Sequence, residues 1–349
     1  MSSSAHGAFT HSTAAAARSP EASASGRGAP ARAPEVIALF GPTGIGKTAV
    51  AVALARRLRT LKGTGTLKGT GERGEHPVAI SADALQVYQG IETLTGVATA
   101  AEQRELEHRL VSFLPIDASF SAGQYVELAH AEIDDALAEG RRPIVVGGTG
   151  LYLRAALCNL DLRPPPSEGV RERWIAELER DGAPALHARL AQRAPWAAGE
   201  IDPNDRQRIV RSLELLDAGE LPHPGAGEPP SGPSQLWTDE MRHPTLLVGL
   251  TMEREALYRR IDTRVEAMLA AGVREEVLRA HAAGASATAR KALGFQELLS
   301  GDVEAMKRHT RNYARRQLTW MRKLAGVRLL DLTDLSPEQA AGEIAAMSA

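Results

Sequence analysis

Residues 41–48 carry the feature that most restricts how this chain can fold. An apolar run at 36–40 precedes them and a helical pattern at 49–58 follows. The segment matches the pattern GxxxxGK[ST] and reads Gly41-Pro42-Thr43-Gly44-Ile45-Gly46-Lys47-Thr48. A strand, a glycine-rich loop and a helix in this order let backbone N–H groups and a helix N-terminus converge on an anion. The segment therefore predicts a phosphate or diphosphate site, and by itself it does not single out ATP.

Further short apolar runs bounded by turn residues predict the other strands of a sheet. They lie at 78–81, 110–114, 144–146, 246–250 and 327–330. Their β-branched residues favour buried strands, and the helical patterns between several of them are typical of a parallel sheet. From 166 to 241 the strand signal disappears and apolar residues recur at helical spacing. The expected fold class is α/β: a P-loop NTPase-like parallel sheet flanked by helices, with a helical insertion domain.

The chain divides into regions of different composition. Residues 1–34 are rich in Ala and Ser without hydrophobic periodicity, which predicts a disordered tail. Residues 35–165 and 242–349 are expected to form the core domain, and residues 166–241 the helical insertion domain. A tandem repeat of Thr-Leu-Lys-Gly-Thr-Gly predicts a surface-loop insertion over 60–75. Two long amphipathic helical patterns, at 253–283 and 303–324, complete the core.

Cysteine content and charge limit the classes of protein. The single cysteine, Cys158, excludes an internal disulfide and a multi-cysteine zinc cluster. No apolar run approaches the ~18 residues that cross a bilayer, so we expect no membrane partner and a cytoplasmic location. The net charge of −2 is uneven, because residues 307–323 carry seven Lys and Arg residues and no acid. This asymmetry favours contact with nucleic acid, although a solvated helix face is the commoner cause of a short charge run.

Two other strand ends carry polar residues that suit a site. Asp83 follows the apolar run at 78–81, and Thr149 follows the run at 144–146 within Gly147-Gly148-Thr149-Gly150. Ligands of open α/β sheets bind at the carboxyl ends of the strands, where these residues are expected with the glycine-rich loop. Asp83 as the N-cap of a helix, and Thr149 as part of an ordinary tight turn, are the structural alternatives.

The ordered set of motifs resembles the tRNA dimethylallyltransferase family, also called tRNA isopentenyltransferases. The resemblance runs from about 35 to 322 and rests on 41–48, 81–88, 147–152, 202–211, 257–265, 292–297 and 315–320. A P-loop alone is shared by many functions, whereas this ordered set is highly specific. One position departs from the family. Where the family usually has Asp-Ile-Gly-Thr-Ala-Lys, residues 92–97 read Glu-Thr-Leu-Thr-Gly-Val, so that Val97 replaces the lysine.

The resemblance implies transfer of a dimethylallyl group from dimethylallyl diphosphate to N6 of the adenine at tRNA position 37, next to the anticodon. It implies that Asp83 is the base and that Thr149 contacts the reacting adenine. Lys47 and the loop from Gly41 to Thr48 would bind the diphosphate, with Mg²⁺ as cofactor and Thr48 as its protein ligand. The enzyme is expected to be a monomer.

The same resemblance assigns a set of residues to the anticodon stem-loop of tRNA. They are Asp83, Ala84, Leu85, Gln86, Thr149, Arg171, Gln207, Arg208, Ile209, Val210, Arg211, Lys291, Gly294, Gln296, Arg315, Arg316, Gln317, Trp320 and Arg322. Gln86 has an amide suited to the edge of an adenine. On a helix, Tyr313, Gln317 and Trp320 share a face that favours core packing. Arg208 and Arg211 can also be solvent-facing charges paired with Glu214.

Three other functions fit part of the pattern. An adenylate dimethylallyltransferase uses the same donor and P-loop, but it needs neither a helical insertion nor a long basic helix. A small-molecule P-loop kinase would turn over ATP and use Asp83 as a base for a substrate hydroxyl. An RNA-binding protein with a vestigial nucleotide fold would have no reason to combine Lys47, Thr48, Asp83 and Thr149.

Overall fold

The structure is a computed structural model that describes residues 33–60, 76–160, 162, 167, 169–221 and 238–348. The predicted tail, apart from its last two residues, lies outside the described residues, and so does the predicted insertion, apart from Thr60. Within the described ranges, no helix is long and apolar enough to cross a membrane.

In the described part of the chain, six parallel strands form one sheet. The strands are β1 (Val36–Phe40), β2 (Pro77–Ser81), β3 (His108–Arg109), β4 (Arg142–Gly147), β5 (Thr245–Thr251) and β6 (Arg328–Asp331). They lie in the order β3-β2-β4-β1-β5-β6. Because β2, β4 and β1 are neighbours and parallel, the loops that follow them leave the same edge of the sheet side by side. The parallel α/β class predicted from the sequence is confirmed.

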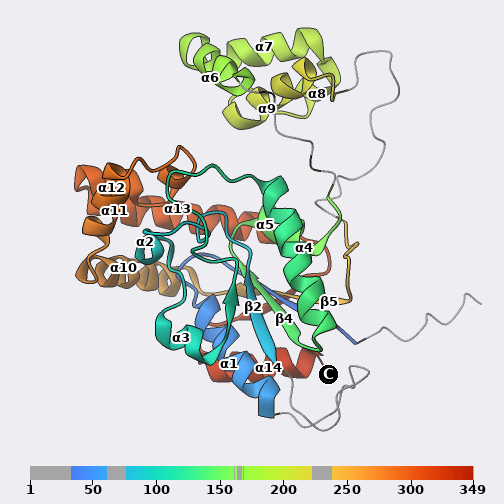
Figure 1. Ribbon diagram of the computed structural model, residues 1–349, viewed down its shortest axis with the longest axis vertical. Coiled ribbons are helices and arrows are strands. Elements are labelled where there is room, and N and C mark those ends of the chain that lie inside the picture. Colours follow the sequence, from blue (N-terminus) through green and yellow to red (C-terminus); the bar gives the residue numbers. More distant parts are fainter. Residues whose placement is uncertain are drawn as a thin grey trace, which may run out of the picture. The chain divides into compact units, whose positions relative to one another are not determined.

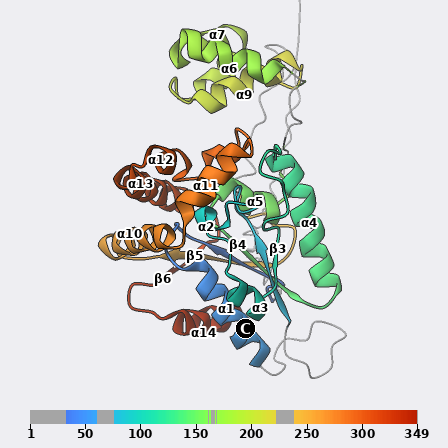
Figure 2. The ribbon, with the colours of Figure 1, turned by 60° about the vertical axis from the view of Figure 1, so that its left-hand side comes forward.

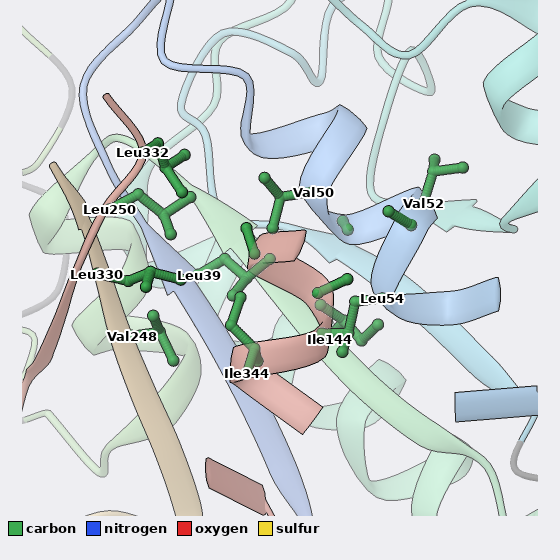
Figure 3. Close-up of a cluster of buried hydrophobic side chains, with 14 of the residues drawn as sticks. Leu39, Val50, Val52, Leu54, Ile144, Val248, Leu250, Leu330, Leu332 and Ile344 are labelled. Carbon is green, nitrogen blue, oxygen red and sulfur yellow. The ribbon is translucent and has the colours of Figure 1, made fainter. Parts of the chain in front are cut away.

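Helices cover both faces of the sheet. The helices α1 (Lys47–Thr60) and α14 (Pro337–Ser348) pack on one face, and α4 (Ala122–Ala138) and α5 (Gly150–Leu157) on the other (Figure 1). Strand β1 alternates accordingly, since Ile37 and Leu39 belong to the α1 and α14 cluster, whereas Ala38 and Phe40 belong to the α4 and α5 cluster. Figure 3 shows part of the first cluster, in which Leu39 and Ile144 of the sheet lie close to helix residues such as Leu54 and Ile344.

A further group of helices packs beyond the carboxyl edge of the sheet (Figure 2). Its members are α2 (Glu92–Thr95), α10 (Arg254–Ala270), α11 (Val273–Ala282), the 3₁₀ turn Ala289–Lys291, α12 (Phe295–Ser300) and α13 (Val303–Met321), and α3 (Ala100–Glu105) lies beside α1. Their shared hydrophobic cluster includes Tyr88, Leu94, Val265, Phe295 and Met306. This cluster fixes α10 and α13 beside the loops that leave the sheet.

Four helices that follow α5 and precede β5 in the chain form a separate hydrophobic cluster. They are α6 (Val170–Asp181), α7 (Ala183–Arg193), α8 (Pro195–Gly199) and α9 (Arg206–Asp217). Trp174, Leu186, Leu190 and Leu213 are among the buried members of this cluster. The Trp174 indole also donates to the Asp217 carboxylate at 2.7 Å. These helices are called the helical module below, and the exact limits of an insertion domain stay a prediction.

Two local expectations were wrong, and one structural alternative is ruled out. Residues 110–114 do not form a strand, because Leu110 and Ser112 have φ of 59° and 48°, which no extended strand allows. The pattern at 253–283 is two helices, since Gly272 has φ of 82° and breaks it. Asp83 caps no helix; its Oδ1 accepts a hydrogen bond from Leu85 N at 3.0 Å within a turn.

Candidate active site

A cavity of about 690 Å³ lies at the carboxyl edge of the sheet. The loop after β1 and the start of α1 line it with Gly46, Lys47 and Thr48, and the loop after β2 lines it with Asp83. The helices α10 and α13 close it with Arg264, Tyr313 and Gln317, and Val97 also lines it. Thus the structure brings together the P-loop and Asp83, which the sequence placed at separate strand ends.

The P-loop has a conformation that depends on glycine. Gly46 has φ of 97° and stands immediately before α1, so the loop turns directly into the helix N-terminus. Lys47 Nζ folds back and donates to the carbonyl oxygens of Gly41 at 2.9 Å and Pro42 at 3.1 Å. The ammonium group is therefore held at the mouth of the loop, where a phosphate oxygen could also reach it.

Burial and neighbouring charges set the electrostatics of the cavity. Burial lowers the pKa of Lys47 to about 8; the negative charge of Asp83 opposes this shift and the positive charge of Arg264 adds to it. Burial also lowers the pKa of the Arg264 guanidinium, again against the effect of Asp83. Two desolvated cations thus lie near the Asp83 carboxylate, an arrangement in which an added anion would be stabilised.

Two arginines of α10 border this anion site, and the sequence analysis gave neither a role. A Cβ atom on Gly46 would lie 2.8 Å from Arg260 Nη2, and one on Gly96 would overlap Arg264 Nη2. Both guanidinium groups therefore lie directly against loops of the cavity. Their four-residue spacing places them on one side of a helix, and both lie in the motif at 257–265. These two features are the sequence signals that could have found them.

Thr149 follows β4 and precedes α5, and its side chain does not cap that helix. It lies near the Tyr313 hydroxyl and acts to lower the pKa of that group. Burial, aided by the negative charge of Asp83, holds the pKa of Tyr313 above its ordinary value. Thr149 and Asp83 thus act in opposite directions on the pKa of one tyrosine of α13, for which only a packing role was expected.

Gln86 uses its side-chain amide within the protein. Its Oε1 accepts from the Ser81 hydroxyl at 2.8 Å, and its Nε2 donates to Gly96 O at 3.0 Å. Gln86 thereby ties the end of β2 to the loop that carries Gly96, against which Arg264 lies. The expected contact with an adenine edge stays a prediction, and it would require Gln86 to exchange these partners.

The helix α13 packs closely on the glycine-rich turn after β4. A Cβ on Gly148 would overlap Gln317 Nε2, and a Cβ on Gly150 would overlap the Trp320 ring. These two glycines are therefore needed for the approach of α13. Gln317 is buried, and its exposed fraction is 5%. The face shared by Tyr313, Gln317 and Trp320 packs inward, as the sequence analysis favoured.

The opposite side of α13 carries exposed cations. Arg308, Arg315 and Arg322 are exposed and recur every seven residues, and Arg316, also exposed, lies over the Tyr313 ring at 5.4 Å. Not all of the basic run is available, because Lys307 pairs with Glu266 at 3.0 Å and Arg311 with Asp262 at 2.8 Å. The exposed cations of α13 suit phosphate groups. The predicted tRNA contacts Lys291 and Gln296 are also exposed, whereas Gly294 is buried.

The remaining residues assigned to tRNA lie in the helical module. Gln207 and Arg208 are exposed on α9, whereas Ile209 and Val210 belong to its buried cluster. Arg171 and Arg211 both pair with the fully buried Glu214, at 2.7 and 3.2 Å. The alternative in which Arg211 pairs with Glu214 therefore holds, whereas Arg208 lies 3.6 Å from Asp205 instead. Ile209 and Val210 pack inside the module, so their side chains are not placed to touch RNA.

A glycine-rich loop after the first strand of a parallel sheet, joined in one cavity by two cations and a carboxylate, defines a P-loop-like α/β protein equipped for chemistry on an anionic substrate. Comparison with known proteins narrows this class. Residues 86–324 match the family model described as IPP transferase. The chain belongs to the tRNA dimethylallyltransferase family.

The sequence similarity to individual relatives extends over most of the chain. It is 35% identical to a tRNA dimethylallyltransferase of Geobacillus kaustophilus, with 86% of this chain and 92% of the relative covered. It is 40% identical to the protein of that name from Anaeromyxobacter dehalogenans, with 84% and 93% covered. The crystal structure of a tRNA isopentenylpyrophosphate transferase from Bacillus halodurans is similar with a TM-score of 0.60 at 31% identity, covering 89% of this chain and 94% of that one.

Proposed function

We propose that this enzyme transfers the dimethylallyl group of dimethylallyl diphosphate to N6 of the adenine at tRNA position 37, next to the anticodon, and releases diphosphate. The observation that carries the proposal is the cavity that combines the P-loop and Lys47 with Asp83, in a member of this family. We also propose that the enzyme is a monomer and acts in the cytoplasm.

The cationic side of the cavity suits a leaving diphosphate. As the bond between the allylic carbon and the diphosphate oxygen breaks, negative charge grows on that oxygen. Lys47, Arg264 and the N–H groups at the start of α1 line or border the position where this charge would develop. Apolar side chains in the same cavity, among them Leu94, Val265 and Met306, offer a surface for the five-carbon group.

Asp83 suits the acceptor side of the reaction. The lone pair of the adenine N6 is delocalised into the ring, so removal of its proton during attack helps, by an order of ~10²- to 10⁴-fold for a well-placed base. Asp83 is half-buried and lines the cavity. One of its carboxylate oxygens accepts the Leu85 N–H within the backbone turn after β2. Its second oxygen can accept the N6 proton. The adenine must leave its stack to reach this depth.

The residues present are compatible with Mg²⁺. Thr48 places a hydroxyl in the cavity, and an oxygen ligand of this kind, shared with substrate phosphates, is how proteins usually hold this ion. Among the described residues there is no cluster of three or more His, Cys, Asp or Glu that would form a full cage. The ion, when bound, would neutralise charge on the diphosphate.

Transfer of label tests the proposal directly. The purified protein is incubated with Mg²⁺ and radiolabelled dimethylallyl diphosphate, and in parallel with unmodified tRNA, AMP or ATP. We expect label in tRNA alone, with RNA digestion placing it on the adenosine after the anticodon. Label in AMP or ATP would assign the enzyme to the adenylate-modifying class. Phosphoryl transfer from ATP without prenyl transfer would assign it to the kinases.

A further inference from the structure

Gln317 connects two loops of the cavity through a single side chain. Its Oε1 accepts a hydrogen bond from Thr43 N, in the P-loop, at 2.9 Å. Its Nε2 donates to Gly148 O, in the turn after β4, at 2.8 Å. The two partners lie 274 and 169 residues away in the chain. A buried amide whose oxygen and nitrogen are both used fixes the distance between the partners.

The contacts of Gln317 lie close to the anion site. The position that a Cβ would take on Gly148 is 3.3 Å from Lys47 Nζ and 3.1 Å from Gly41 O, so the turn held by Gln317 lies against the P-loop lysine. Lys47 in turn donates to Gly41 O and Pro42 O, the residues immediately before Thr43. Gln317 and Lys47 therefore hold the same short stretch of the P-loop from two sides.

We propose that Gln317 is a positioning residue of the diphosphate site and not a tRNA contact. It orients the P-loop so that the N–H groups after Thr43 and the Lys47 ammonium point at the leaving group before it binds. Preorganised donors of this kind are worth more than donors that must be ordered by the ligand. This inference rests on the proposed function for the identity of the ligand, and on the two hydrogen bonds for the role of the residue.

Gln317 and the exposed cations of α13 lie on different sides of the helix, so diphosphate positioning and RNA binding can be tested separately. Arg315 and Arg322 lie on the exposed side of α13, whereas Gln317 is 5% exposed and faces the loops. Loss of the amide should therefore weaken diphosphate binding and leave RNA affinity unchanged. A direct RNA contact by Gln317 would show the opposite pattern.

The test compares Gln317→Met with Thr319→Ala, a control on the exposed side of α13 whose hydroxyl donates only to Arg315 O within its own helix. Methionine keeps the length of the side chain but makes neither hydrogen bond. We expect Gln317→Met to raise the Kd of inorganic diphosphate by about tenfold, as for the loss of one to two hydrogen bonds. The KM for dimethylallyl diphosphate should rise with it, while the Kd of tRNA stays at the wild-type value.

A second variant, Gln317→Asn, keeps the amide but is one methylene too short to reach both partners, and it replaces the first if Gln317→Met does not fold. Wild-type diphosphate affinity in either folded variant would overturn the inference, and so would a loss confined to RNA binding. If wild-type protein transfers no label to tRNA, the proposed function fails. The effect of Gln317 on diphosphate binding remains measurable in that case.

Discussion

Replacing Asp83 with asparagine separates the chemistry of this site from its structure. The asparagine side chain would keep an oxygen that can accept the Leu85 N–H, which Asp83 Oδ1 accepts at 3.0 Å, so the turn after β2 should persist. The variant loses the ability to take a proton. Transfer to tRNA should fall by ~10²- to 10⁴-fold, which corresponds to about 2.7–5.4 kcal/mol of transition-state stabilisation.

Binding by the same variant should change much less. The negative charge of Asp83 opposes the lowering of the pKa values of Lys47 and Arg264 by burial. Its removal therefore lowers the Lys47 pKa further, and it also removes repulsion of the diphosphate. These effects oppose each other near neutral pH, and the RNA-facing cations of α13 are untouched. We expect diphosphate and RNA affinities of the same order as in the wild type.

Single-turnover transfer of label, filter binding of tRNA and thermal unfolding measure these quantities. Asp83→Ala is the matched variant, because it also removes the acceptor of the Leu85 N–H and should lose about 1 kcal/mol of stability in addition. Transfer by Asp83→Asn at the wild-type rate would remove Asp83 from the mechanism. A rise in the Kd of tRNA as large as the loss of transfer would show that Asp83 acts in RNA binding.

Three further predictions concern the anion site and its packing. The affinity for dimethylallyl diphosphate should be highest below the Lys47 pKa of about 8, where the ammonium is charged, and fall by up to about tenfold per pH unit above it; a flat calorimetric profile through this region would contradict that. Arg264→Gln should weaken diphosphate binding by about 10- to 100-fold without changing the Kd of tRNA, because a charged hydrogen bond contributes about 1.5–3 kcal/mol. An equal loss of affinity for both ligands would show that Arg264 does not act specifically on the diphosphate. Gly150→Ala should cost ~1–3 kcal/mol of unfolding free energy in a denaturant titration, because the added Cβ overlaps the Trp320 ring; a wild-type midpoint would show that α13 moves freely.

The sequence determined the parts of this protein that follow from local pattern. The motif at 41–48 with its flanking strand and helix, and the apolar runs that became β2, β4, β5 and β6, define a parallel α/β protein. The side-chain period also separated the exposed arginines of α13 from its buried face. These features are readable because hydrophobic periodicity and glycine-rich turns act over a few residues.

Tertiary structure alone decided which distant residues meet. Arg264 lines the cavity because α10 packs beside the P-loop, and nothing near residue 264 in the sequence indicates that neighbour. The helical period placed Gln317 on an inward face, but only the structure shows that its amide joins Thr43 to Gly148. The segment 110–114 has the apolar composition of a strand, yet its backbone turns to follow residues 86–89. In each case the outcome depends on packing between elements far apart in the chain, which local propensity cannot encode.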